Sequence, residues 1–355
     1  MKKNNYLYVI LWAGLLLFLF PNITLAKEEE NLGYTVSAVP SSKQIDPEQS
    51  YFYIQTTPGE IQQLKVNVKS TRKEPVKINI YPTNAFTGDQ GTIEYTEDSK
   101  LLDETLKDPI SSIVKVDTPS LTVEDYEEKE LTIQLTSPKE SYSGVKIGAL
   151  VFELDGTEKD QPVTNKFAYR IGLITSENGD DYKDSKTLNL LDAKSTLKRG
   201  KKMVLATLQN PEPKILSNID IQAEVREKDS KKVVKKTTAK QYNMAPNSRF
   251  EFEMDWGTSA IKGGTYLLNM TVSNGYNDWK FEKEFTITGA QAKQMNEDSG
   301  FKIITPIWIK AVTIVLLIMT GVMIFVLLKR RKKMESQWKS RKRKKRKKRK
   351  KKEVR

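Results

Sequence analysis

Hydrophobic and polar residues alternate with a period of two along much of the chain after Tyr34. The clearest runs lie at 64–68, 76–80 and 131–135. Such alternation turns one face of a strand toward a core and the other toward water. Segment 145–154 is more continuously apolar, as expected of a central strand covered on both faces. With turn residues between the runs, the pattern predicts a β-sandwich over residues 32–154.

A second group of strand patterns follows the polar stretch at 156–161. Segment 163–175 predicts a strand that suits either neighbouring domain, and we assign it to the second. The pattern then continues at 202–209, 219–225, 250–254, 266–272 and 279–287. These runs predict a second sandwich over residues 163–298, with a short helix near its end at 290–296. The expected fold class is therefore all-β, with two tandem immunoglobulin-like sandwiches.

Two apolar segments lie outside these patterns. Residues 1–26 are typical of a secretory signal peptide, with small residues before a predicted cleavage between Ala26 and Lys27. Residues 307–328 predict a transmembrane helix, whose uncharged part at 311–328 would span about 27 Å. Lys and Arg that adjoin a span stay on the cytoplasmic side. We therefore expect a single-pass type I membrane protein with both domains outside the cell.

The net charge of +14 comes from the C-terminal tail. Residues 329–355 hold 19 Lys and Arg against 2 Asp and Glu, whereas residues 27–328 have a net charge of −5. Twelve consecutive basic residues occupy 341–352. A run of this kind without a fold predicts a disordered cytoplasmic tail that contacts anionic lipid, and we favour this over nucleic-acid binding.

The chain contains neither Cys nor His, which excludes several chemistries. Disulfides, thiolate nucleophiles, Cys-type zinc sites and Ser-His-Asp triads are impossible. An exported protein without disulfides fits the surface of a Gram-positive cell. The acidic loop at 177–184 is rich in oxygen atoms but lacks the register of a calcium loop, so we interpret it as a solvated turn. We expect no metal and no cofactor.

One catalytic alternative rests on a group of carboxylates. Glu127, Glu128 and Glu130 lie near Asp125 and could pair as in a glycoside hydrolase, which makes a cell-wall hydrolase the alternative function. Their alternation with the apolar positions of the following strand favours the solvated start of a strand instead. We therefore expect a protein that is not an enzyme.

Five aromatic residues are the candidates for binding. Tyr51 and Tyr53 share one face of a predicted strand, and Phe52 points to the other. An exposed tyrosine pair can stack on a sugar or anchor a protein partner. The other three, Trp256, Tyr276 and Trp279, lie at or beside turns of the second domain. For all five, the alternative is a structural role in the core or in a turn, because large aromatic side chains are mostly buried.

Motifs in both domains carry a family resemblance. In the first domain these are Tyr34-Thr35-Val36, Pro40, Gln44, Tyr51-Phe52, Pro58-Gly59, Thr87, Gly91, Tyr95, Gly144 and Ile147-Gly148-Ala149. In the second they are Asn210-Pro211, Met244-Ala245-Pro246-Asn247-Ser248, Gly264, Tyr266, Trp279 and Phe285-Thr286-Ile287-Thr288. With these motifs, the chain resembles the two-domain surface proteins that are encoded beside WxL-domain proteins in Gram-positive bacteria. It departs from them at Ser41 and Lys43, where the family often has Pro and Asn.

This resemblance implies a function that the patterns alone do not give. The first domain would bind peptidoglycan and a WxL-domain partner, and the second would bind host extracellular components. The expected protein is thus a membrane-anchored surface scaffold or adhesin, with its domains in the cell wall.

Overall fold

The computed structural model describes residues 32–155, 167–303 and 306–352. The predicted signal peptide and its cleavage site at Ala26 and Lys27 lie outside these residues. The chain divides into two compact units. The larger comprises the residues up to Lys194, Val204–Met254 and Thr265–Thr286, and the smaller comprises Ser195–Met203, Asp255–Gly264 and the residues from Ile287 onward.

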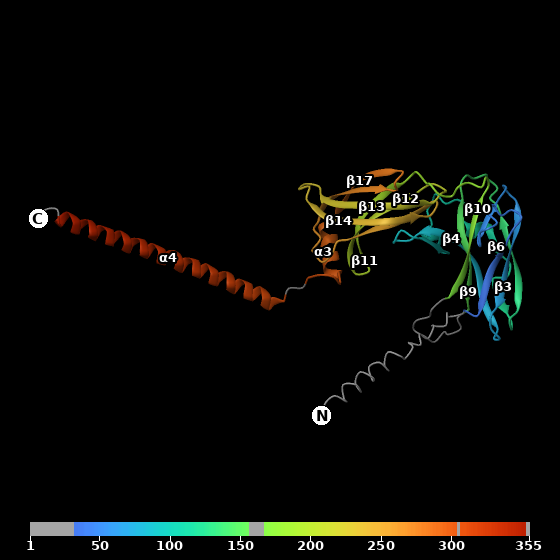
Figure 1. Cartoon of the computed structure of the whole chain (residues 1–355), viewed down its shortest axis with the longest axis horizontal. Helices are drawn as coiled ribbons and strands as arrows, with labels where there is room; N and C mark the ends of the chain where they lie inside the picture. The colour runs from blue at the N-terminus through green and yellow to red at the C-terminus, as the bar shows by residue number, and fades with distance from the viewer. Residues whose placement is uncertain (1–31, 156–166, 304–305, 353–355) are drawn as a thin grey trace, which may run out of the picture. The chain divides into compact units, whose positions relative to one another are not determined.

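The first sandwich lies entirely in the larger unit (Figure 1). One sheet has the order β1 (Tyr34–Val39), β3 (Ile61–Ser70), β8 (Glu128–Thr136), β6 (Val114–Val116). The other has the order β2 (Phe52–Gln55), β10 (Ala168–Ser176), β9 (Lys146–Leu154), β4 (Val76–Thr87), β5 (Ile93–Thr96), and β7 (Ser120–Val123) also pairs with β4. Two short helices, η1 (Ser99–Leu101) and α2 (Ile110–Ile113), lie in the connections.

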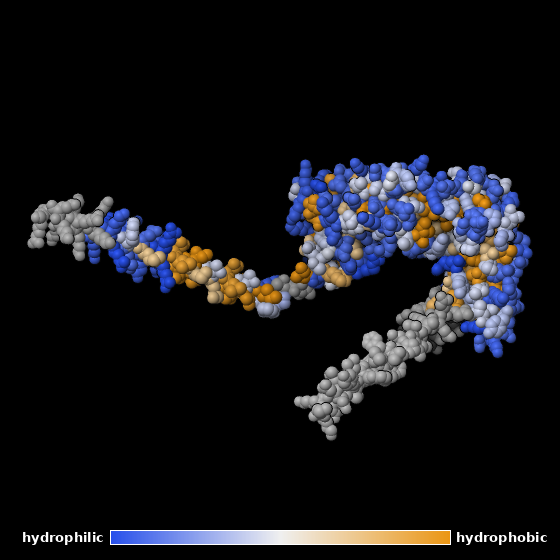
Figure 2. Space-filling view, in the orientation of Figure 1, coloured by the Kyte–Doolittle hydropathy of each residue, from blue (hydrophilic) through white to orange (hydrophobic). Residues whose placement is uncertain are grey.

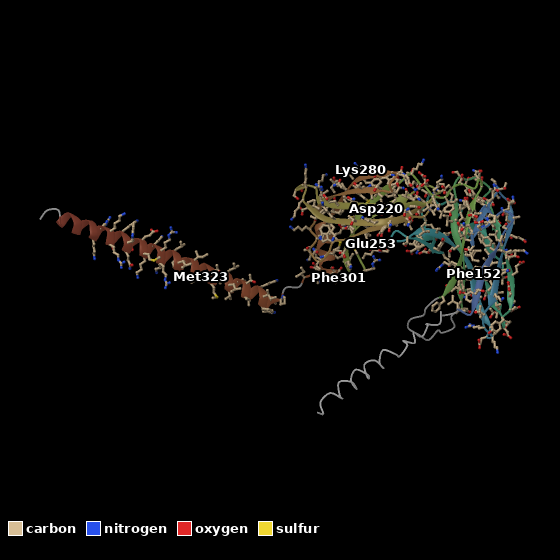
Figure 3. The ribbon with its side chains drawn as sticks, in the orientation of Figure 1. Phe152, Asp220, Glu253, Lys280, Phe301 and Met323 are labelled. Atoms are coloured by element: carbon tan, nitrogen blue, oxygen red, sulfur yellow. The ribbon has the colours of Figure 1, made fainter. Side chains whose placement is uncertain are left out.

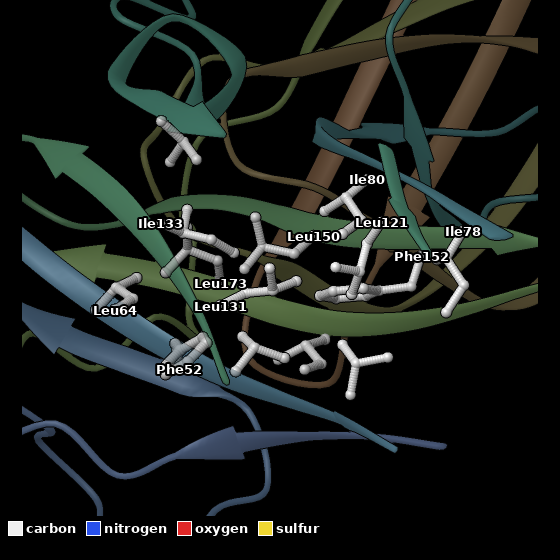
Figure 4. Close-up of a cluster of buried hydrophobic side chains, with 14 of the residues drawn as sticks. Phe52, Leu64, Ile78, Ile80, Leu121, Leu131, Ile133, Leu150, Phe152 and Leu173 are labelled. Carbon is white, nitrogen blue, oxygen red and sulfur yellow. The ribbon is translucent and has the colours of Figure 1, made fainter. Parts of the chain in front are cut away.

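The period-two pattern fills the core between these sheets. Alternate residues of β3 are buried, and the same holds for β8, as their sequences predict. Figure 4 shows Phe52, Leu64 and Phe152 in this core, where each is at most 1% exposed. Tyr34 is also fully buried, and its hydroxyl donates to the carbonyl of Phe152 at 2.6 Å. Desolvation by burial raises the pKa of Tyr34 to about 12.

Strand β10 belongs to the first sandwich, whereas we assigned segment 163–175 to the second domain. It runs antiparallel to β9 and parallel to β2, and so lies between them in the sheet. The polar stretch at 156–161 suggested a domain boundary. Sheet pairing places the end of the first sandwich after β10, because its buried Ile171 and Leu173 complete the same core as Phe152.

The second sandwich also has two sheets. They have the orders β11 (Asn189–Lys198), β12 (Lys201–Asn210), β15 (Ser248–Asp255) and β14 (Val233–Met244), β13 (Leu216–Glu227), β16 (Gly264–Ser273), β17 (Asp278–Ile287). The predicted helix is present as α3 (Gly289–Asp298), which begins with a capping box between Thr288 and Gln291. Mostly β-strand sheets in two tandem sandwiches thus confirm the expected fold class.

Helix α4 (Ile307–Lys352) contains the apolar segment and continues into the basic tail. Its first part is apolar enough to span a membrane and is exposed throughout (Figure 2). The tail is helical in the structure, although we expected it to be disordered. Residues 322–352 contain neither Gly nor Pro, and Lys and Arg have high helix propensity, so no residue ends the helix before Lys352.

Candidate binding pocket on the first sandwich

A pocket of about 410 Å³ lies on the outer face of the sheet that contains β2, β10 and β9. Its lining residues are Ser50, Tyr51, Tyr95, Ile147, Gly148, Arg170, Ile171, Gly172, Ile174 and Tyr182. All of them belong to the larger unit. The volume is in the range of small-molecule sites, and the lining combines aromatic rings with one cation.

Alternation in β2 and β10 places the pocket side chains. Phe52 and Ile54 point into the core, so Tyr51 and Tyr53 point to the outer face, as the sequence predicts. In β10, Ile171 and Leu173 are core residues, which leaves Arg170 and Gly172 on the outer face.

Two glycines on adjacent strands line the pocket, and the one on its outer face, Gly172, opens the floor. Gly148 pairs with Leu173, one position away from Gly172 in the register of β9 and β10. A Cβ at Gly172 would lie 3.4 Å from the Cβ of Tyr51, so any larger side chain there would occupy the pocket beside that ring. A Cβ at Gly148 would lie 2.2 Å from the carbonyl oxygen of Thr83, so close strand packing requires glycine at 148. Glycine within a strand often marks a place where a ligand or another backbone approaches closely.

The aromatic walls are held in place by hydrogen bonds. The hydroxyls of Tyr51 and Tyr182 lie 3.2 Å apart, and the ring of Tyr182 packs edge-on against Tyr53 at 5.6 Å. The hydroxyl of Tyr53 donates to the carbonyl of Asp180. Desolvation by burial, with the hydroxyl of Tyr182, raises the pKa of Tyr51 to about 12. Tyr51 is therefore neutral at physiological pH and can offer both its ring face and its hydroxyl to a ligand.

Arg170 supplies the positive charge of the pocket. It is exposed, and no carboxylate of the described residues lies within 4.0 Å of its guanidinium. Burial raises the pKa of Tyr95, while the nearby charge of Arg170 lowers it, which places that charge close to the Tyr95 ring. An arginine beside aromatic rings can bind a carboxylate with two parallel hydrogen bonds.

The acidic loop at 177–184 closes one side of this region with its own hydrogen bonds. Glu177 accepts from the hydroxyl of Ser141 at 2.6 Å and from the backbone N–H of Tyr142 at 3.0 Å. Asp180 accepts from the backbone N–H of Gly144 at 2.8 Å. These hydrogen bonds fix the loop, and the loop in turn holds Tyr182 over the sheet.

Of the five aromatic candidates, only Tyr51 lines this pocket. Tyr51 forms a wall, whereas Tyr53 is 6% exposed and supports Tyr182 from below. Trp279 donates its indole N–H to the carbonyl of Lys186 at 3.1 Å and is half-buried. Tyr276 is 88% exposed in the turn between β16 and β17. Trp256 belongs to the smaller unit, and its backbone N–H donates to the carbonyl of Lys202.

Sequence reasoning missed Arg170, Gly172 and Tyr182 as site residues, and it cited Tyr95 only as part of the resemblance. A usable signal was present in the strand Ala168–Ser176, where Arg170 and Gly172 alternate with core residues. A glycine flanked by such residues on an outer face indicates an open position.

The second-domain motif and the first-domain Thr87 meet within the larger unit. The backbone N–H of Ala245 donates to the Thr87 hydroxyl at 3.0 Å, and that hydroxyl lies 2.6 Å from the Ser248 hydroxyl. Asn247 has a positive φ of 47° and donates to the carbonyl of Pro211 at 2.7 Å. These residues therefore have a structural role, as their turn chemistry predicts.

Solved structures resemble this chain only distantly. The chain is 12% identical to a protein in a chaperone–tip adhesin complex of CFA/I fimbriae, covering 66% of this chain and 93% of that one with a TM-score of 0.27. The chain is 13% identical to the CupB2 chaperone of Pseudomonas aeruginosa, covering 63% of this chain and 92% of that one with a TM-score of 0.24. It is also 13% identical to a protein in the CsuC–CsuE chaperone–tip complex of Acinetobacter baumannii, covering 65% of this chain and 93% of that one with a TM-score of 0.29. The chain has no match among curated proteins.

Family comparison is more informative. Residues 34–154 match the model of the WxL Interacting Protein peptidoglycan binding domain. Residues 158–297 match the model of the host binding domain of the same family. Together the two matches cover well over half of the chain, in the order that the resemblance implies. The chain therefore belongs to the WxL Interacting Protein family.

Proposed function

We propose that this protein is a membrane-anchored surface scaffold whose first sandwich binds peptidoglycan in the pocket formed by Tyr51, Tyr95, Arg170 and Tyr182. The observation that carries this proposal is the combination of ring faces, an open glycine floor and one exposed guanidinium in a domain of the peptidoglycan binding type. Its second sandwich would bind host or other surface components, in line with the second family match.

The chemistry of the pocket suits a glycan that carries carboxylates. The apolar faces of amino sugars stack on tyrosine rings, and tyrosine hydroxyls bond to sugar hydroxyls and amides. Peptidoglycan adds carboxylates on its lactyl groups and stem peptides, which a guanidinium can bind in bidentate fashion. A single shallow site of this kind binds weakly, but tethering many copies to one surface raises the effective affinity.

The contacts of the acidic cluster support a binding protein over the hydrolase alternative. Glu130 pairs with Lys65 at 2.7 Å, and Glu128 pairs with Lys69 at 3.8 Å. The backbone N–H of Glu124 and the ammonium of Lys129 lower the pKa of Glu127. A catalytic acid in a glycoside hydrolase needs a raised pKa, so this environment favours the ordinary role of surface carboxylates.

The name of the family implies a WxL-domain partner, and we propose that this partner binds the first domain. Strand β1 is the end strand of its sheet and pairs with β3 over Tyr34–Val39. The outer edge of such a strand offers backbone N–H and C=O groups to which a partner strand can pair. We therefore propose β1 as the docking edge for the partner.

Helix α4 would anchor the protein in the membrane of a Gram-positive cell. Its apolar part is long enough to span a bilayer, and basic residues follow it from Lys329 onward. This order favours a type I topology, with the sandwiches in the cell wall and the basic tail on anionic lipid inside. Protease added to intact cells would then release peptides from both sandwiches and none from the tail.

Co-sedimentation with purified peptidoglycan sacculi tests the proposed function. Full-length protein in nanodiscs should sediment with the sacculi, and the variant Arg170→Gln should sediment much less. The variant Tyr276→Ala is a control, because Tyr276 is exposed and lies outside the pocket. Failure of the wild-type protein to sediment would contradict the proposal, and so would clearing of sacculi that requires Glu127 and Glu130.

A further inference from the structure

In the smaller unit, the chain leaves the second sandwich directly beside the hairpin turn between β11 and β12. The carbonyl of Gly200 in this turn accepts from the backbone N–H of Gly300 at 3.0 Å and from the hydroxyl of Ser299 at 3.2 Å. Ser299 is 2% exposed, so this contact is buried. The ammonium of Lys201 lies 5.3 Å from the ring centroid of Phe301. The turn and the exit segment are therefore held together.

This region is basic, although residues 27–328 as a whole are acidic. The turn contains Lys198, Arg199, Lys201 and Lys202, and the same unit adds exposed Lys262 and Lys302. We call the accessible part of this group the basal turn, defined as exposed Arg199, Lys262 and Lys302 with half-buried Lys198 and Lys201. Lys202 is not part of it, because Lys202 is 1% exposed and donates to the carbonyl of Ser259 at 2.6 Å.

Exposed apolar side chains lie next to these cations. Phe301, which Figure 3 labels, is 51% exposed, and Ile303 is 75% exposed. Bilayer-surface segments combine basic residues with aromatic and aliphatic ones, because the cations meet headgroup phosphates while the apolar groups enter the boundary below.

The conformation of Arg199 gives a second, independent indication. Arg199 has a φ of 52° and Gly200 has a φ of 72°, so the two-residue hairpin requires positive φ at both positions. Asn or Asp followed by Gly is strongly preferred in such turns, and arginine is disfavoured there. A strained residue that persists at an exposed turn points to a use for its side chain.

The reach of the chain brings this turn to a bilayer if α4 spans it, as we proposed above. Six residues lie between Gly300 and Ile307, so seven Cα–Cα steps allow at most about 25 Å between them. The polar headgroup layer extends several Å beyond the hydrocarbon core. Cations on the basal turn can therefore lie within one Debye length, about 8–10 Å, of the headgroups.

We infer that the basal turn, with Phe301 and Ile303, docks on anionic phospholipid headgroups at the extracellular surface of the cell membrane. This inference rests on the proposed membrane span. Docking would hold the second sandwich against the bilayer at its exit point, in addition to the covalent link through α4. The side chains that meet the phosphates are those of Lys198 and Arg199 on the turn that contacts the exit segment, because Lys201 pairs with Asp255 at 3.2 Å.

A fluorescence-quenching experiment on the full chain tests this docking. Because the chain contains no Cys, Ala260→Cys introduces a single labelling site in an exposed loop of the same unit. The labelled protein is reconstituted into vesicles whose headgroups carry nitroxide quenchers. One set of vesicles contains about 30% phosphatidylglycerol, or roughly one negative charge per three lipids, and the other contains phosphatidylcholine alone. We expect at least twofold stronger quenching in the anionic vesicles, and loss of that difference at about 1 M salt.

Two variants separate docking from folding. Arg199→Asn removes one charge but suits the positive φ better, so it should raise the thermal midpoint while it lowers quenching in anionic vesicles. Combining it with Lys198→Gln should lower quenching to the level seen with phosphatidylcholine. Lys73→Asn in the first sandwich removes the same charge elsewhere and should change nothing.

Each outcome has a defined meaning. Equal quenching in both vesicle types, or quenching that the paired variant leaves unchanged, would overturn the docking inference while leaving the membrane span intact. Extraction of the unlabelled full chain from the vesicles by alkaline carbonate would show that α4 does not span, and would overturn both proposals.

Discussion

The two sandwiches differ in what their outer β-faces leave available. The first presents a pocket of about 410 Å³ with Arg170 at its rim and glycine in its floor. The second presents a smaller polar pocket of about 250 Å³ over β13, β14 and β16. There Lys236 pairs with Glu224 at 2.8 Å, and Arg226 contacts the same carboxylate. The cations of the second face are thus neutralised within the protein, whereas Arg170 is left for a ligand.

This contrast teaches that composition alone does not identify a binding face. Both faces contain arginine and polar side chains, and only the arrangement of carboxylates and small residues separates them. The ammonium of Lys236 lowers the pKa of Glu224, so Glu224 is ionised and neutralises its neighbours at physiological pH. No acidic residue within the pocket lining of the first sandwich does the same for Arg170.

Filling the pocket floor should have the largest effect. Gly172→Val places a β-branched side chain beside Tyr51, where its Cβ makes an ordinary contact at 3.4 Å. Because valine suits a strand, the fold should be kept or stabilised while sugar access is blocked. We expect peptidoglycan affinity to fall at least about thirtyfold, roughly the value of one fully lost ring contact and its hydrogen bonds. Thr271→Val on the second face is the matched control, and unchanged sedimentation of Gly172→Val would refute the assignment.

Removing the charge should have the next largest effect. Arg170→Gln keeps a polar side chain and loses the charge-assisted hydrogen bonds to a carboxylate, so affinity should fall about tenfold. The salt dependence of binding should weaken at the same time. Arg226→Gln is the matched control on the second face. An isotherm for Arg170→Gln that overlays the wild-type curve, at both low and high salt, would count against a carboxylate ligand.

Removing the carboxylate that pairs with the cations of the second face should have a smaller effect, which is a gain in binding to anions. Glu224→Gln leaves Arg226 and Lys236 without their shared carboxylate. We expect a several-fold rise in the retention of full-length protein on an anionic polymer column, because two exposed cations become available. Glu251→Gln, at another carboxylate of the second sandwich that pairs with Lys194, is the comparison variant. If neither variant changes retention, internal pairing does not explain the difference between the two faces.

The smallest effect should come from Tyr51→Phe. The ring remains and the contact with the Tyr182 hydroxyl is lost, so peptidoglycan affinity should change by less than about twofold. Because the folded pKa of Tyr51 is raised to about 12, its contribution to stability is present below pH 10 and is lost as the pH rises through about 12. The free energy of unfolding of the variant, measured in denaturant titrations, should therefore fall less steeply between about pH 10 and pH 12 than that of the wild-type protein. An equally steep loss would show that Tyr51 does not contribute to it.

Much of the fold could be predicted from the alternation of apolar residues. Strands β3, β8 and β9 follow the pattern closely because their alternating or continuous apolar residues are buried in one core. Strand β14 was missed, since VVKKTTAKQYNM forms an end strand of its sheet and buries few side chains. The sheet that β10 joins could not be predicted from the sequence, because only pairing with β9 and β2 decides it.

The pocket could be predicted only in part. Strand period correctly placed Tyr51 opposite Phe52, but it could not show that Tyr182, more than one hundred residues later, covers the same face. The position of Arg170 beside Tyr95 depends on the order of β10, β9, β4 and β5 in the sheet, which no local pattern encodes. Aromatic residues at turns, such as Trp279, were equally plausible candidates until the hydrogen bond to Lys186 showed what holds that side chain.

Photo-crosslinking from two positions of the full-length protein in intact bacteria would test the role of the first-sandwich pocket most directly. A photoreactive phenylalanine derivative replaces Tyr95 in the pocket in one variant and Thr238 on the second face in the other. We predict muropeptide adducts at position 95 that disappear when Gly172→Val is added, with none at position 238. Equal adducts at both positions, or adducts at position 95 that persist in the filled pocket, would contradict that role.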